Sequence, residues 1–195
     1  MRITLLGGSF DPPHRGHLEM ARFCVQNSQR LLIIPAAHAP LKKHSPIVSD
    51  EHRIHMLELL LSPLDGWEID TWELLQNPPN FTIDTLTEMR RRFRDAQFTI
   101  AIGQDQLVQF RQWKNWAVIV KWADLLCFRR SGELPAYDIS DLPLTWVEDF
   151  DYAISSMQLR AMLVRKDPAV SQWIPQSVLE YINDHALYKN NQVQG

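Results

Sequence analysis

The sequence predicts an α/β fold: a doubly wound parallel sheet with a small helical C-terminal part. Short apolar runs of strand character alternate with segments of helical periodicity along the chain. The first strand, helix and strand of this series fall within about 35 residues, the size of a βαβ unit, whose right-handed crossover makes the two strands parallel. No repeat, low-complexity segment or linker interrupts the 195 residues, so we expect one domain over 1–195, with the helical C-terminal part at about 150–190.

The N-terminal half holds the predicted βαβ unit and a loop with functional character. In chain order we predict a strand at 2–6 ended by Gly7-Gly8, a helix at 16–28, a strand at 31–34 stopped by Pro35, a loop at 36–49, and a helix at 50–61 with Asp50 as its N-cap. The loop is rich in Pro, His, Lys and Ser, a composition typical of functional loops carried by a rigid scaffold.

The second half continues the alternation and ends in helices. In chain order we predict a strand at 67–72, a turn at 76–80, a helix at 81–94, a strand at 97–102 ended by Gly103, a short helix within 113–121, a strand at 124–128, a loop at 130–143, a strand at 145–147, and helices at 155–164 and 175–186. In doubly wound folds ligands bind beyond the carboxyl ends of the strands. Gly7-Gly8 and Gly103 would both lie at that edge.

Composition excludes several classes of partner. The net charge of −3, with 45% hydrophobic and 22% charged residues, is ordinary for a soluble domain and gives no reason to expect a nucleic-acid or membrane partner. Cys24 and Cys127 lie far apart in apolar surroundings, so we interpret both as reduced core residues. The apolar segment at the N-terminus is too short for a signal peptide and ends at Gly7, and no apolar run approaches membrane-spanning length. We therefore expect a cytoplasmic protein.

The loop after the first strand has the composition of a phosphate site. Gly7-Gly8 would allow either close approach of the backbone to a ligand or a positive φ. His14 and His17 flank Gly16 at the start of the next helix, where unpaired N–H groups and the helix dipole favour an anion. The alternative is a structural turn with two surface histidines. The sequence lacks both GxGxxG and GxxxxGK[ST] here, and a zinc site would need a third ligand at a usual spacing.

This loop resembles the signature of the HxGH nucleotidyltransferase superfamily, which has a Rossmann-like fold. The form GGSFDPPHRGH over 7–17 is similar to that of the bacterial nicotinate-mononucleotide adenylyltransferase family. Further segments resemble that family in the same order. They are IIP at 33–35 with APLK at 39–42, Arg53 with ML at 56–57, NFTIDTL at 80–86, IGQD at 102–105 with Trp113, FRRSG at 128–132, ISSMQLR at 154–160, and IP at 174–175 with YI at 181–182 and LY at 187–188. The resemblance implies transfer of AMP from ATP to nicotinate mononucleotide, giving deamido-NAD and pyrophosphate, in NAD biosynthesis.

The resemblance also implies which residues do the work. Catalysis would rest on positioning and charge stabilisation, with His17 and His14 on the phosphates and Arg160 on the pyrophosphate. The implied ATP-binding residues are Gly8, Ser9, Phe10, His14, His17, Gly103, Asp105, Ser155, Ser156 and Arg160. The implied acceptor-binding residues are Gly7, Lys42, Phe81, Thr82, Asp105, Trp113 and Lys114. Mg²⁺ would arrive on the ATP phosphates, with no protein cage.

Each of these residues also has a plainer interpretation. Asp105, a ribose ligand in the functional interpretation, could be a helix N-cap, and Thr82 likewise. Trp113, the expected platform for the nicotinate ring, could be a core residue. Ser155 and Ser156 could be capping serines and Arg160 a solvated arginine. Lys42 could be half of a solvated lysine pair.

Four positions depart from the family pattern. Met157 replaces a threonine expected near the ATP phosphates, Leu41 and Ala39 replace a histidine and a proline, and Phe81 replaces a tyrosine. Three other functions stay open: the same transfer to nicotinamide mononucleotide, transfer to phosphopantetheine, and a non-catalytic nucleotide-binding protein of the same fold, which Met157 and Leu41 would favour. A monomer and a homodimer are both compatible with the sequence.

Overall fold

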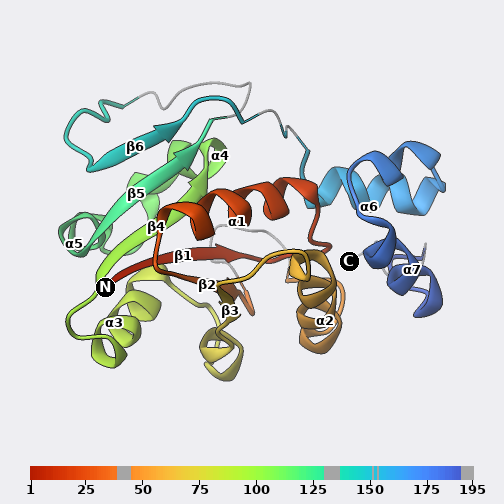
Figure 1. The fold of residues 1–195 in the computed structure, drawn as a ribbon, viewed down its shortest axis with the longest axis horizontal. Coiled ribbons are helices and arrows are strands. Elements are labelled where there is room, and N and C mark those ends of the chain that lie inside the picture. The colour runs from red at the N-terminus through yellow and green to blue at the C-terminus, as the bar shows by residue number, and fades with distance from the viewer. Residues whose placement is uncertain (39–44, 130–136, 151, 153, 190–195) are drawn as a thin grey trace.

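A six-stranded, all-parallel sheet forms the centre of the molecule (Figure 1). The computed structural model describes residues 1–38, 45–129, 137–150, 152 and 154–189. The strands lie in the order β3-β2-β1-β4-β5-β6. Their bounds are β1 Arg2–Gly8, β2 Arg30–Pro35, β3 Trp67–Ile69, β4 Gln97–Gly103, β5 Ala123–Phe128 and β6 Leu144–Val147. This order reverses between β1 and β4, which confirms the predicted doubly wound sheet.

Helices cover both faces of the sheet. The helices are α1 Arg15–Asn27, α2 Asp50–Leu61, α3 Thr82–Arg92, α4 Gln104–Val108, α5 Trp116–Trp122, α6 Ser156–Arg165 and α7 Gln176–Asp184, with 3₁₀ helices η1 Trp72–Leu75, η2 Phe110–Gln112 and η3 Pro168–Gln172. One apolar cluster joins α1, α2, α6 and α7 to the sheet, and a second joins α3, α4 and α5 to the other face. The predicted C-terminal helices thus pack into the same core as α1.

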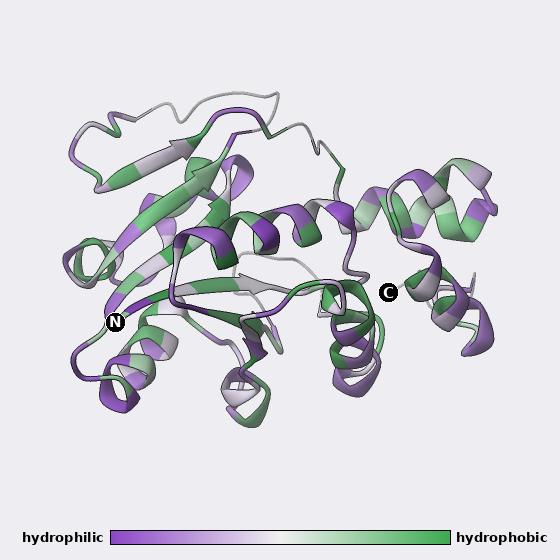
Figure 2. Ribbon diagram, in the orientation of Figure 1, coloured by the Kyte–Doolittle hydropathy of each residue, from purple (hydrophilic) through white to green (hydrophobic). Residues whose placement is uncertain are grey.

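The period-2 pattern of the strands divides their side chains between these two clusters. Leu31 and Ile33 of β2 belong to the α1 side, whereas Leu32 and Ile34 belong to the α3 side. All four are buried, as expected for a strand covered on both faces. Hydrophobic colour accordingly runs along the central strands, while the helices alternate between hydrophobic and hydrophilic residues (Figure 2).

Several predicted boundaries are wrong by one to three residues. β3 ends at Ile69, not at Trp72, because Asp70 Oδ1 accepts a hydrogen bond from Trp72 N at 2.9 Å and turns the chain into η1. Ser49 is the N-cap of α2, and Asp50 is its first residue. Pro175 is the N-cap of α7 and not its first helical residue. Helix α4, which follows β4 without a loop, was not predicted.

The cysteines and the helix lengths bear on two further expectations. Cys24 and Cys127 are both buried thiols, as predicted. Within the described ranges, none of the helices combines the length and apolar character needed to cross a bilayer.

Candidate active site

The two histidines form a reciprocal cap on helix α1. His14 is the N-cap, and its Nδ1 accepts a hydrogen bond from Gly16 N at 3.2 Å. His17 Nδ1 accepts in turn from His14 N at 3.2 Å, so the pair is a capping box made of imidazoles. A backbone N–H can only donate, which leaves the proton of each neutral ring on Nε2. The fold therefore sets both tautomers and places the N–H of each neutral ring on Nε2.

The two rings also lie against each other. Their centroids are 3.8 Å apart at an interplanar angle of 35°. His14 is 2% exposed, while His17 is half-buried. The interpretation of the pair as two surface histidines is therefore wrong: they are part of the packed start of the helix.

Gly16 is the residue that allows this cap. A Cβ added there would lie 3.0 Å from both Cε1 and Nδ1 of His14 and 3.3 Å from Tyr152 Cβ. A side chain at this position would require the His14 ring to shift by a few tenths of an ångström. The close packing of this ring favours glycine between the histidines, a reason the sequence pattern alone did not provide.

The glycines at the end of β1 have different roles. Gly7 is exposed, and a Cβ there would meet only Ile34 O, at 4.0 Å. Gly8 makes room for Phe10, whose ring would lie 3.0 to 3.3 Å from a Cβ. The positive φ that we considered for the glycines falls instead on Phe10, at 49°. Phe10 as a whole is 2% exposed, so its ring is packed inside the protein beneath the loop.

Four carbonyl groups of the loop are held by donors from other elements. The accepting oxygens are those of Gly8, Ser9, Asp11 and Pro12, and their donors are Ala36 N (2.9 Å), Arg53 Nη1 (2.7 Å), Arg160 Nη1 (2.5 Å) and Ser156 Oγ (2.9 Å). A carbonyl that already accepts a hydrogen bond repels a neighbouring anion less, and its fixed direction turns the loop amides into a stable set of donors. The loop is therefore pre-organised for an anion.

Arg53 supports this loop from α2 and was not singled out as a functional residue. It is fully buried, and besides Ser9 O it contacts Asp50 Oδ1 through Nη2 at 2.6 Å. Its Nε has no partner among the described residues. A buried arginine that bonds a loop carbonyl is a signal that only the three-dimensional structure could provide.

The start of α6 meets the histidine loop. Ser155 is the N-cap: its Oγ accepts from Gln158 N at 3.2 Å, and Gln158 Oε1 accepts from Ser155 N at 2.9 Å, so the capping interpretation is confirmed for this residue. Arg160 is not a solvated arginine, since its side chain is 21% exposed and bound to the loop. Met157, the departure from the family pattern, is 69% exposed at the same helix start.

Gly103 and Asp105 lie at the neighbouring strand end. β1 and β4 are adjacent and parallel, so their carboxyl ends share one edge at the point where the strand order reverses. Gly103 is buried and is the N-cap of α4, so Asp105 is not. Asp105 is exposed in the first turn, and its Oδ2 accepts from Gln106 Nε2 at 2.9 Å.

The predicted acceptor residues converge from two distant segments. Lys114 Nζ lies 4.4 Å from the centroid of the Phe81 ring and 3.2 Å from Asp84 Oδ2. Phe81 is the N-cap residue of α3 without a side-chain capping bond, and Thr82 is the first helical residue. The N-cap alternative for Thr82 is therefore wrong. Trp113 is half-buried beside Phe110, with ring centroids 5.1 Å apart.

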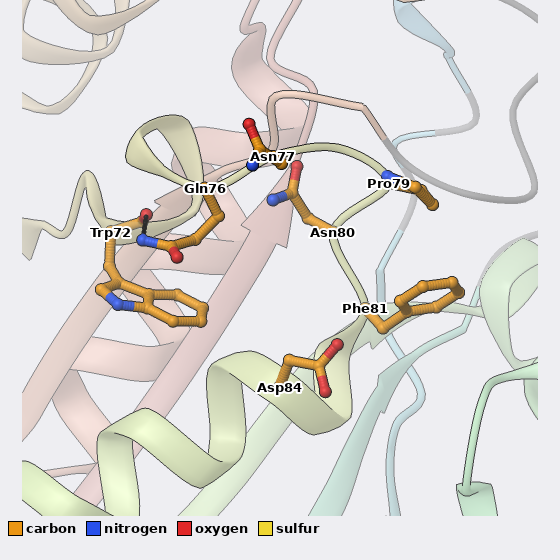
Figure 3. Close-up of a pocket in the computed structure, with 7 residues that line it drawn as sticks. All are labelled: Trp72, Gln76, Asn77, Pro79, Asn80, Phe81 and Asp84. Carbon is orange, nitrogen blue, oxygen red and sulfur yellow. Dashed lines mark hydrogen bonds between the residues drawn. The ribbon is translucent and has the colours of Figure 1, made fainter.

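A cavity of about 330 Å³ opens beside this segment (Figure 3). It is lined by Trp72, Gln76, Asn77, Pro79, Asn80, Phe81 and Asp84. Asn80 ties its wall together, since Asn80 Nδ2 donates to Glu73 O at 3.0 Å and Asn80 Oδ1 accepts from His38 N at 3.2 Å. Lys42 and Leu41 lie outside the described residues. The described residues contain no group of three His, Cys, Asp or Glu side chains that could hold a metal ion.

An open parallel sheet with a histidine-capped anion loop after its first strand defines a nucleotidyltransferase of Rossmann-like fold. A family model described as cytidylyltransferase-like matches residues 5–162. A protein of Prosthecochloris aestuarii named "probable nicotinate-nucleotide adenylyltransferase" is 35% identical, over 96% of this chain and 98% of that protein. The chain belongs to the cytidylyltransferase-like family and, within it, to the nicotinate-nucleotide adenylyltransferases.

Other similarities agree with this assignment. A protein of Methylacidiphilum infernorum with the same name is 30% identical over 97% of this chain and 93% of that protein. Among solved structures, a nicotinic acid mononucleotide adenylyltransferase of Plasmodium falciparum in complex with NaAD superposes with a TM-score of 0.80. At 17% identity, covering 96% of this chain and 97% of the other, that similarity concerns the fold.

Proposed function

We propose that this enzyme transfers AMP from ATP to nicotinate mononucleotide, which gives deamido-NAD and pyrophosphate in NAD biosynthesis. The observation that carries the proposal is the reciprocal histidine cap, which fixes two imidazoles at a helix N-terminus that favours an anion. The names of the relatives support the acceptor. We also propose that residues 1–195 act as one nucleotidyltransferase unit, since α6 and α7 share a core cluster with α1 and α2.

The reaction needs no nucleophilic side chain. An oxygen of the nicotinate mononucleotide phosphate attacks the α-phosphorus of ATP in line, the new P–O bond forms as the bond to the β-phosphate breaks, and pyrophosphate leaves with the negative charge. The acceptor phosphate is already ionised, so catalysis rests on positioning and on donors aimed at the developing charge. His17 and His14 stabilise the α-phosphate region. Arg160 holds the leaving pyrophosphate through the N–H groups that do not bind the loop.

The remaining nucleotide contacts follow from the geometry of the strand ends. Gly8, Ser9 and Phe10 act through their main chain, and the buried Phe10 ring keeps that main chain in place. Gly103 and Asp105 bind the ribose, since Asp105 is exposed beside the loop edge. Ser155 and Ser156 present the start of α6 to the phosphates while their hydroxyls cap the helix and bind Pro12 O.

The acceptor is recognised by the segments that converge at Phe81. Trp113 stacks on the nicotinate ring, and main-chain amides near Thr82 and Lys114 bind its carboxylate. Gly7 leaves open space beside the acceptor. Phe81 supports the site through its contact with Lys114, and Lys42 approaches the acceptor phosphate.

Magnesium and the cellular context complete the proposal. Mg²⁺ is carried by the ATP phosphates, with ligands mainly from phosphate and water. The enzyme works in the cytoplasm, which the two buried thiols support, as a monomer or a homodimer.

The deciding experiment supplies ATP and Mg²⁺ with either nicotinate or nicotinamide mononucleotide and measures pyrophosphate release. We expect kcat/KM to be about 100-fold higher for nicotinate, since hydrogen bonds to a charged group contribute about 1.5–3 kcal/mol. Equal rates would reassign the acceptor. ATP binding without turnover of either acceptor would support a non-catalytic nucleotide-binding protein, and turnover that survives EDTA would contradict the role of Mg²⁺.

A further inference from the structure

Asp11 is a buried carboxylate that the reaction above does not use. It is 2% exposed, although it belongs to the loop between Gly7 and His17. Its Oδ1 accepts a hydrogen bond from Tyr188 OH at 2.7 Å, and its Oδ2 accepts from Ile47 N at 2.8 Å. A buried carboxylate is costly unless it is paired and hydrogen-bonded. Since protein donors occupy both oxygens, we exclude a direct role of Asp11 in phosphate binding.

The third partner of Asp11 is the arginine proposed to hold pyrophosphate. Arg160 Nη1 donates to the main-chain oxygen of Asp11 at 2.5 Å and lies 3.5 Å from its Oδ2. Within the described residues, both contacts use the same nitrogen, so the rest of the guanidinium is available to an oxyanion. The direction in which Arg160 points is thus set by where Asp11 is held.

Tyr188 is held in a strained conformation to reach Asp11. It lies 177 residues further along the chain, is 1% exposed, and has a φ of +58°. A left-handed backbone is unfavourable for a bulky residue and persists only where the surroundings enforce it. Burial and the Asp11 carboxylate both raise the pKa of the Tyr188 hydroxyl above its ordinary value. The phenol therefore stays protonated and acts as a donor.

We propose that Tyr188 is a positioning residue for the leaving-group site: it fixes the Asp11 carboxylate, which in turn sets the Arg160 guanidinium. This inference rests on the proposed function at one point, the assignment of pyrophosphate binding to Arg160. It assigns the C-terminal end of the described chain a part in phosphate recognition, although Tyr188 touches no phosphate itself. It also explains why a strained, buried tyrosine follows α7.

The molecule contains a matched control for this proposal. Tyr181 lies in α7, and its hydroxyl bonds His52 Nδ1 at 2.9 Å on α2. Tyr181→Phe and Tyr188→Phe each delete one hydrogen-bonded phenol from the same C-terminal part, but only Tyr188 contacts Asp11. A general loosening of α7 would therefore affect both variants, whereas a specific route to Arg160 affects one.

The first test measures binding of inorganic pyrophosphate by calorimetry, which needs no acceptor. We expect Tyr188→Phe to bind pyrophosphate about 10-fold more weakly and to lose about 10-fold in kcat, since small misplacements of a charge-stabilising group have effects of this order. The KM of Tyr188→Phe for nicotinate mononucleotide should stay within about 2-fold of that of the unmodified chain. The pyrophosphate affinity of the control, Tyr181→Phe, should also stay within about 2-fold. Equal weakening in both tyrosine variants would overturn the proposal.

The second test places Tyr188→Phe in an Arg160→Ala background. If Tyr188 acts through Arg160, the double variant should bind pyrophosphate no more weakly than Arg160→Ala alone, whereas independent effects would multiply. Asp11→Asn provides a second probe of the same route if Tyr188→Phe proves unstable, with the same expected non-additivity. If the losses in pyrophosphate binding multiply, the inference about Tyr188 is wrong, but the proposed function of the enzyme is unaffected. If the losses in pyrophosphate binding are non-additive but the unmodified chain does not turn over nicotinate mononucleotide, the proposed function is wrong and the inference about Tyr188 stands.

Discussion

The phosphate side and the acceptor side of this site are built in different ways. On the phosphate side, the loop of residues 7–17 is bound by side chains from α2, α6 and the segment after α7. On the acceptor side, Lys114 meets Asp84 and Phe81 near the surface, with the Lys114 and Asp84 side chains 45% and 49% exposed. One half is a braced loop in the core, and the other is a set of contacts at the rim of an open cavity.

This difference follows from what each half must do. Stabilising charge on a reacting phosphorus requires donors fixed before the reaction, in surroundings that exclude water. Recognition of a planar ring requires a stacking surface and a few amides, and a half-exposed rim is sufficient for that. An exposed ion pair such as Lys114–Asp84 contributes about 0.2–1 kcal/mol. We therefore expect variants on the phosphate side to change turnover, and variants on the acceptor side to change affinity.

The largest effect should come from His17→Gln. Glutamine at this position of a helix can still accept from the His14 N–H, as it does in ordinary capping boxes, so the helix start is preserved while the imidazole donor is lost. Steady-state kinetics should show kcat falling by about 10²–10³-fold, the usual effect of removing one such donor. The melting temperature should stay within about 2 °C.

His14→Asn extends this test to the buried ring. Asparagine is among the best N-cap residues, so α1 should keep its cap and the protein its stability, while turnover falls by a similar factor. Near-normal turnover in both variants would show that the imidazoles serve only as caps. In that case the phosphate side would be structural, and the contrast between the two halves would disappear.

A smaller effect is expected from Trp113→Ala. Loss of the indole removes a stacking surface that contributes about 1.4 kcal/mol, so the KM for nicotinate mononucleotide should rise about 10-fold, with kcat changed little. Trp146→Ala is the matched control, because Trp146 is a half-buried tryptophan at β6, packed against the same core cluster. A loss confined to kcat in Trp113→Ala would place this residue on the phosphate side of the comparison.

The sequence was informative about the contacts that are local in the chain. Hydrophobic periodicity predicted the alternation of strands and helices apart from α4, and the sequence placed both histidines at a helix start, although their mutual capping was not predicted. The long-range contacts could not be predicted: Arg160 reaches Asp11 over 149 positions and Tyr188 reaches it over 177. No pattern of residue types indicates which buried arginine will bind which carbonyl, and the reason for Gly16 became clear only from the position of the His14 ring.

The smallest effect concerns Glu73, the buried polar residue beneath the acceptor cavity. It is 8% exposed, and its Oε1 accepts a hydrogen bond from Thr85 Oγ1. Burial raises the pKa of its carboxyl above 4.5, an effect that the Thr85 bond opposes and the charge of Asp70 increases.

The sign of the pH dependence follows from this shift. Because the folded-state pKa lies above the unfolded value, the contribution of Glu73 is most favourable below about pH 4.5 and is lost as pH rises through the folded-state pKa. Glu73→Gln keeps an acceptor for Thr85 and removes the charge. Thermal melts from pH 4.5 to pH 8 should therefore show this variant gaining Tm over the unmodified chain as pH rises, with each 1 kcal/mol giving about 2–4 °C. A Tm difference that is constant with pH would mean that burial of Glu73 is not what limits the stability of the acceptor side. A gain accompanied by an unchanged kcat would sharpen the comparison, since it would separate the support of the acceptor cavity from the chemistry of the histidine loop.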